Sequence, residues 1–160
     1  MMSNKVWTFT NKKELNKSQF LDYFERKIFR TIRKHSMLPK NKTIKLKKSN
    51  NLNTMALKSV LEKKFKVEFS TNPNFSTENL SQIAEDIFKN ILKGNFKHQI
   101  PKNAPLSQLS DKEIELYTKL SNTKGTKRKQ NKKIQNLFEK FLKKNQDLEI
   151  NVTKAMLQIK

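Results

Sequence analysis

Residues 43–69 read TIKLKKSNNLNTMALKSVLEKKFKVEF, and this stretch decides the fold class. Its first four residues and its last three alternate polar and apolar side chains, as short strands do. Between them, residues 54–64 carry four apolar side chains at helical spacing, namely Ala56, Leu57, Val60 and Leu61. A strand, a turn, a helix and a second strand in this order predict a βαβ unit, whose two strands pair in parallel through a right-handed crossover.

Helices are predicted on both sides of this unit. After Ser18, an expected N-cap, an apolar stripe predicts a first helix that ends before Pro39, and its members are Phe20, Phe24, Ile28 and Ile32. Residues 79–93 carry the most regular apolar stripe of the chain, so we expect this helix to form the centre of the core. Thr77 is its candidate N-cap, and Gly94 stands where a helix-ending glycine belongs.

A further helix begins at a capping box that runs from Ser110 to Glu113, and it ends near Leu120. Apolar residues at helical spacing in 134–142 and 150–159 predict helical elements in the C-terminal half. The sequence therefore predicts a mostly helical α/β fold. Its small parallel sheet has two or three short strands, and its C-terminal half is helical.

The composition excludes several classes of chemistry. The chain has no cysteine, which removes disulfides, iron–sulfur clusters, thiolate metal sites and cysteine nucleophiles. Two histidines, His35 and His98, are too few for a histidine-based zinc enzyme. With Gly94 and Gly125 as the only glycines, a glycine-rich phosphate loop is not expected. We therefore expect no metal and no cofactor.

No stretch approaches the roughly 18 apolar residues of a membrane span. The first ten residues also lack the apolar segment of a secretory signal. We therefore expect a protein of the cytoplasm or of an organelle interior that is not secreted and has no membrane partner.

The charge points to a polyanionic partner. The chain has 35 Lys and Arg against 14 Asp and Glu, a formal net charge of +21. A coding bias toward A-rich codons is a plain explanation for part of this excess, and RNA contact is the alternative. The basic residues gather at 26–34, 40–48 and 124–133, and the last group contains no acid. The candidate RNA-binding residues are Arg26, Lys27, Arg30, Arg33, Lys34, Lys124, Lys127, Arg128, Lys129, Lys132 and Lys133.

Other polar and aromatic residues have two interpretations. Glu85 and Asp86 are expected on a solvated helix face rather than as a catalytic acid pair. Tyr23 is expected in the core. Trp7 and Phe9 lie in an alternating segment that indicates a short strand or an ordered tail, and they either stack on bases or pack in the core.

Several segments, taken in order, resemble the PP-loop ATP pyrophosphatases that make 2-thiouridine in tRNA. The matching segments are FERKIFRTIRK at 24–34, the strand and helix at 43–61, NLSQIA at 79–84, NILKGN at 90–95 and IPKNAPL at 100–106. The resemblance implies a reduced PP-loop domain, of the adenine nucleotide alpha hydrolase type, at residues 18–122. Residues 1–17 then correspond to an N-terminal tail, the remnant of a metal module without its cysteines, and 123–160 to a basic linker with C-terminal helices.

The chain departs from this family where the chemistry takes place. The family's loop reads Ser-Gly-Gly-Lys-Asp-Ser, whereas this chain has Ser49, Asn50, Asn51, Leu52, Asn53 and Thr54. Without the glycines and the lysine, the loop loses its close backbone approach to phosphate and its cation. Ser49 and Thr54 are therefore interpreted as turn and cap residues. The family's catalytic and zinc-binding cysteines are missing too, so we expect no catalytic residue, although the sequence leaves open whether the chain is an enzyme. The family activity would be that of a tRNA sulfurtransferase.

Two functions stay open. In the first, the chain is a pseudoenzyme that binds tRNA and takes part in, or derives from, wobble-uridine 2-thiolation, with an intact thiolase subunit as a candidate partner. In the second, it is a basic structural protein on RNA, such as a ribosome-associated subunit, with no role in tRNA modification. Selective binding of tRNA over other structured RNA would distinguish the first from the second.

Overall fold

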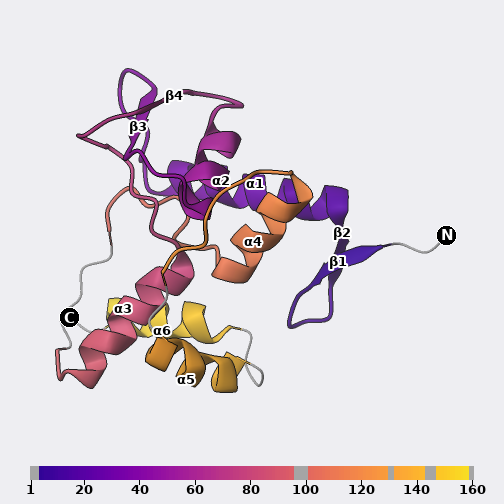
Figure 1. Cartoon of the computed structure of the whole chain (residues 1–160), viewed down its shortest axis with the longest axis vertical. Coiled ribbons are helices and arrows are strands. Elements are labelled where there is room, and N and C mark those ends of the chain that lie inside the picture. The colour runs from indigo at the N-terminus through magenta and orange to yellow at the C-terminus, as the bar shows by residue number, and fades with distance from the viewer. Residues whose placement is uncertain (1–3, 96–100, 130–131, 143–146, 159–160) are drawn as a thin grey trace.

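The computed structural model describes residues 4–95, 101–129, 132–142 and 147–158. Within them, the parallel sheet and helix α2 (Leu52–Leu61) lie at one end of the molecule, and three helices of the second half of the chain lie at the other (Figure 1). Helices α1 (Lys17–Lys34) and α4 (Asp111–Leu120) lie between the two ends. Among these described residues, none of the helices combines the length and the apolar character needed to cross a bilayer.

The predicted βαβ unit is present. Strand β3 (Thr43–Leu46) pairs in parallel with β4 (Lys66–Phe69), with Ile44 opposite Val67. Helix α2 (Leu52–Leu61) connects them and is capped by Asn51, whose side-chain oxygen accepts a hydrogen bond from the Thr54 N–H. The helix therefore begins two residues before the expected position, because an asparagine at the end of the turn supplies the cap.

Helix α1 (Lys17–Lys34) buries its predicted stripe of Phe20, Phe24, Ile28 and Ile32. Its N-cap is Asn16, which exchanges hydrogen bonds with Gln19 in a capping box, so the expectation that Ser18 is the cap is wrong. The capping box starts the helix one residue before Ser18, which lies in the first turn.

An antiparallel hairpin precedes α1. It consists of β1 (Lys5–Thr8) and β2 (Glu14–Asn16). The sequence indicated a strand or a tail here but not the second strand, which is too short to show an alternating pattern. The hairpin packs its aromatic side chains on α1: the ring centroids of Trp7 and Phe20 are 5.5 Å apart, and those of Phe9 and Tyr23 are 5.1 Å apart. Packing is therefore the role of Trp7 and Phe9 in this structure.

The core consists of one large cluster and two small ones. The larger cluster joins α1, α2, β3 and α4 (Asp111–Leu120), with Phe24 stacked on Tyr117 at 4.1 Å. Helix α3 (Leu80–Leu92) instead packs against α5 (Lys132–Leu142) and α6 (Leu148–Gln158), away from that cluster (Figure 1). The expectation that this helix forms the centre of the core is therefore wrong, because the C-terminal helices bury most of its stripe.

The ends of α3 and α4 test the capping predictions. The N-cap of α3 is Asn79, not Thr77, because the Asn79 side-chain oxygen accepts the Gln82 N–H. Gly94 follows the helix with a φ of 76°, as expected of a helix-ending glycine. The capping box of α4 at Ser110 and Glu113 is confirmed. The mostly helical α/β fold with a small parallel sheet is likewise confirmed.

We expect Ile87→Ala to lower the free energy of unfolding by about 2–5 kcal/mol, because the side chain is fully buried between α3 and the C-terminal helices and its truncation leaves a cavity. Chemical denaturation measures this change. Leu92→Ala on the same helix is the matched control: 65% of Leu92 is exposed, so its truncation has little effect. Equal effects of the two substitutions would contradict the packing of α3 described above.

Candidate nucleic-acid interface

Residues 49–54, which we call the loop, comprise the turn before α2 and the first three residues of that helix, and the resemblance places a phosphate-binding loop here. Three of its backbone donors already have partners within the chain. The Asn51 N–H donates to the Ser49 hydroxyl at 3.2 Å, and the Thr54 N–H donates to the Asn51 side chain at 2.8 Å. Ser49 is thus a turn residue, as expected. The expectation that Thr54 is a cap residue is wrong, because its N–H donates to the side-chain oxygen of Asn51, which is the N-cap. The N–H of Leu52, the first residue of α2, donates to the Thr126 carbonyl at 2.7 Å. These three donors would have to leave their partners before they could hold an anion.

The third partner comes from residues 124–129, which we call the strap. Thr126 forms a parallel bridge with Asn51, and its N–H donates to the Asn50 carbonyl at 2.9 Å. Gly125 makes this approach possible, because a Cβ atom there would lie 2.8 Å from the Asn50 carbonyl oxygen. Backbone atoms of the strap therefore lie directly against the loop, where a phosphate would have to bind.

Arg128 fixes the other end of the strap. Its guanidinium binds both carboxylate oxygens of Asp111, at 2.9 and 2.8 Å, and also reaches Glu85 at 3.2 Å. Only 10% of the arginine side chain is exposed. Burial by itself lowers the pKa of Arg128, but the hydrogen bonds and charges of Asp111 and Glu85 outweigh it, so the pKa lies above its ordinary value. This bidentate, buried ion pair connects the strap to the first turn of α4 and to α3.

Two sequence-based expectations are wrong at this network. Arg128 was expected at an RNA surface, but its guanidinium is committed to Asp111 and Glu85. Glu85 was expected on a solvated face and is buried, with 7% exposed. The absence of acids within 124–133 concealed both facts, because the acids that pair with this segment come from distant positions: Asp111 and Glu85, and Glu115 opposite Lys127 at 3.6 Å.

A pocket of about 820 Å³ lies between the loop, the strap and the start of α3. Four lysines line it from three segments: Lys47 after β3, Lys102 in the connector between α3 and α4, and Lys127 and Lys129 in the strap. Acidic side chains of Glu78 and Asp86 line it as well. Lys102 could not be predicted from the sequence, because it lies outside the three basic groups.

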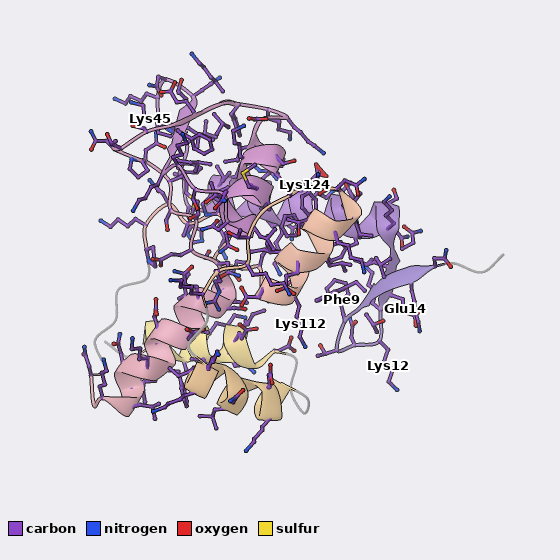
Figure 2. All side chains as sticks on the ribbon, in the orientation of Figure 1. Phe9, Lys12, Glu14, Lys45, Lys112 and Lys124 are labelled. Carbon is purple, nitrogen blue, oxygen red and sulfur yellow. The ribbon has the colours of Figure 1, made fainter. Side chains whose placement is uncertain are left out.

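The remaining predicted RNA-binding residues lie elsewhere. Lys124 is exposed at the start of the strap, near α4 (Figure 2), and Lys132 and Lys133 are exposed at the start of α5. On α1, Arg30, Arg33 and Lys34 are exposed.

Two other members of the α1 group make contacts on their own helix. Arg26 pairs with Asp22 at 3.0 Å, and Lys27 donates to the Tyr23 hydroxyl at 3.0 Å. Tyr23 in turn donates to Glu113 at 2.6 Å. Together with Lys13 and Arg30, Arg26 and Lys27 line a second open pocket, of about 640 Å³, that shares no residue with the first.

No family model and no curated protein matches the sequence. Among solved structures, the chain is similar to one described as the U34-tRNA thiolase NcsA from Methanococcus maripaludis with its [4Fe-4S] cluster. The TM-score is 0.74 at 10% identity, and the match covers 97% of this chain and 84% of the other. At this identity the similarity shows a shared fold. The fold that the sequence resemblance implied is thereby confirmed.

The cofactors of the thiolase fold do not fit the residues present. An iron–sulfur cluster needs thiolate ligands, and this chain has no cysteine. In the part of the chain that the structure describes, no group of three or more histidine, aspartate or glutamate side chains is placed to hold a metal. The backbone of the strap occupies the place where a nucleoside triphosphate would need an open glycine loop.

We expect Arg128→Ala to destabilise the chain by about 3–5 kcal/mol, because it leaves the Asp111 and Glu85 carboxylates close together, buried and without their cation. Thermal or chemical denaturation measures the loss. Lys129→Ala is the matched control on the next, exposed residue, and it should change stability by less than about 0.5 kcal/mol. An unchanged midpoint for Arg128→Ala would show that the network contributes no net stability.

Gly125→Ala should separate the strap from the loop, because the new methyl group cannot occupy the space against the Asn50 carbonyl. Backbone hydrogen exchange then becomes faster at Leu52, whose N–H bonds the strap. The Met55 N–H, which donates to the Asn51 carbonyl in the first turn of α2, is the internal control and keeps its protection from exchange. Unaltered protection at Leu52 would mean that the strap tolerates a side chain.

Proposed function

We propose that the chain binds tRNA through its lysine-lined pocket and does not catalyse the modification of that RNA. The observation that carries the proposal is the position of the strap. Its backbone fills the loop that would hold a nucleotide, while Lys127 and Lys129, on either side of Arg128, line the adjoining pocket with Lys47 and Lys102. Arg128 acts as the anchor that holds these two lysines in place.

Phosphate is the ligand chemistry that these side chains suit. Four ammonium groups from three segments meet at one pocket in a chain of net charge +21. Within the described residues, these lysines form one ion pair, that of Lys127 with Glu115, and the Lys127 side chain remains 75% exposed. An exposed pair of this kind contributes little, so a phosphate oxygen can replace the carboxylate. A lysine ammonium is a point charge and does not form the planar, two-bond contact that reads a base edge. We therefore expect these lysines to contact the RNA backbone.

The exposed arginines and lysine of α1 provide a second set of contacts. Arg30, Arg33 and Lys34 face solvent, and the pocket beside them includes Lys13 from the hairpin. Two separate basic surfaces suit an extended, structured RNA better than a free nucleotide. The similarity of the fold to that of a tRNA thiolase favours tRNA among such RNAs.

Catalysis is not part of the proposal, for chemical reasons. Activation of a tRNA base with ATP needs a cradle for pyrophosphate, and here Asn50, Asn51 and the strap occupy that place. Sulfur transfer by the family's chemistry needs thiolates, which the chain lacks. A protein that retains the fold and the charge but lacks these groups is suited to present tRNA to an intact thiolase subunit, the candidate partner.

The test is the salt dependence of RNA binding. We expect replacement of Lys47, Lys102, Lys127 and Lys129 by Gln to flatten the slope of log affinity against log salt by about 3 units, because each lost phosphate contact removes roughly 0.7–0.9. The matched control replaces four exposed lysines outside this pocket, Lys17, Lys119, Lys140 and Lys154, with the same loss of charge. Fluorescence anisotropy with labelled tRNA measures both slopes.

The outcomes distinguish the two functions left open by the sequence. Equal slopes for the two quadruple variants would show that binding follows net charge alone and would remove the pocket from the interface. At raised salt, we expect tRNA to bind more tightly than a ribosomal RNA fragment of equal length. Equal binding of the two RNAs would favour a general structural role on RNA instead.

A further inference from the structure

The parallel sheet has one closed edge and one open edge. On the outer side of β3, Asn74 takes the place of a third strand: its side-chain oxygen accepts the Lys45 N–H at 2.8 Å, and its N–H donates to the Lys45 carbonyl at 3.1 Å. Its amide also donates to the Thr43 carbonyl. Nothing equivalent lies beside β4, which is paired only with β3 in the described sheet.

The direction of the backbone groups of β4 follows from its pairing. The Ser70 N–H donates to the Leu46 carbonyl at 2.8 Å, so residue 70 faces β3. Because the hydrogen-bonding groups of successive strand residues alternate between the two edges, Lys66 and Glu68 also face β3, whereas Val67 and Phe69 direct theirs outward. The described part of the chain provides no hydrogen-bond partner for the N–H of Val67 or Phe69.

The charged side chains of β4 form no ion pair within the described residues. Lys66 and Glu68 are exposed on the solvent face. On the opposite face, Phe69 is 39% exposed, one of two large apolar side chains so exposed in the described chain. The Lys58 ammonium lies 5.7 Å from the centre of its ring. An unpaired strand edge presents N–H and C=O groups that can pair with another strand, and here it carries one charge of each sign on its solvent face.

We propose that β4 pairs antiparallel with β4 of a second copy of this chain, about a two-fold axis that passes beside Val67. In this register the outward N–H and C=O groups of Val67 meet those of the partner's Val67. Lys66 then lies opposite the partner's Glu68, and Glu68 opposite the partner's Lys66. The strand is thus complementary to itself in charge, which a self-associating two-fold interface requires.

Other arrangements of the same edge fit less well. A parallel pairing in register would place Lys66 beside Lys66 and Glu68 beside Glu68, and like charges opposite each other are destabilising. A shift by two residues in the antiparallel arrangement loses both ion pairs, because it places Lys66 opposite the partner's Lys66 or Glu68 opposite the partner's Glu68. The net charge of +21 opposes association, so the dimer is expected to be weak at low salt and stronger once salt screens the charge.

Sedimentation velocity of the full chain, over a concentration series at raised salt, tests the proposal. We expect a monomer–dimer equilibrium. Glu68→Lys should raise the midpoint concentration, at which half of the chains are dimeric, at least about tenfold, because both cross-strand pairs become repulsive. The double substitution Lys66→Glu and Glu68→Lys should restore the original midpoint. Glu139→Lys, an exposed site on α5 with the same change in charge, is the matched control and should leave the midpoint unchanged.

A backbone variant tests the edge itself. Val67→Pro removes the outward N–H while leaving the bonds between β3 and β4, since proline is tolerated on the solvent side of an edge strand. It should abolish the dimer with an unchanged circular dichroism spectrum. A wild-type chain that stays monomeric throughout the series would overturn the proposal. So would a dimer that Glu68→Lys and Glu139→Lys weaken equally, or a double variant that fails to restore it.

Discussion

The guanidinium of Arg128 connects three parts of the chain that are far apart in sequence. It joins the strap to Asp111 at the start of α4 and to Glu85 on α3, and all three side chains are largely buried. Asp111 also receives the Asn79 amide at 2.8 Å, so the N-cap of α3 belongs to the same network. Buried carboxylates are costly without a cation, and the position of one arginine therefore constrains both helices and the strap together.

This constraint determines the shape of the candidate site. Once Arg128 is fixed, Thr126 pairs with the loop before α2, and Gly125 permits the close approach of the two backbones. The helix N-terminus then bonds protein groups instead of phosphate. The same geometry leaves Lys127 and Lys129 at the pocket with Lys47 and Lys102. One segment thus closes the site where a nucleotide would bind and contributes charge to a surface suited to RNA.

The division of the core explains how a two-stranded parallel sheet is maintained. Parallel sheets are ordinarily covered on both faces, and here Ile44 and Leu46 are fully buried on the inner face, in the cluster that contains α1 and α2. The solvent face carries Lys45, Lys66 and Glu68 and needs no cover. Helix α3 packs with α5 and α6 at the other end of the molecule in two small clusters, so these helices do not cover the parallel sheet (Figure 1).

The sequence by itself determined the elements whose signals are local. Alternation predicted β3 and β4, apolar spacing predicted α1, α2, α3, α5 and α6, and the Ser110–Glu113 box predicted α4. Caps at Asn16 and Asn79 were missed, because asparagine, serine and threonine cap helices about equally well and only the backbone geometry selects among them. The tertiary structure alone decided the partners of Arg128, the burial of Glu85 and the meeting of Lys102 with the strap. These are contacts between residues tens of positions apart, and neither a charge count nor a periodicity records which distant side chains the packing of helices brings together.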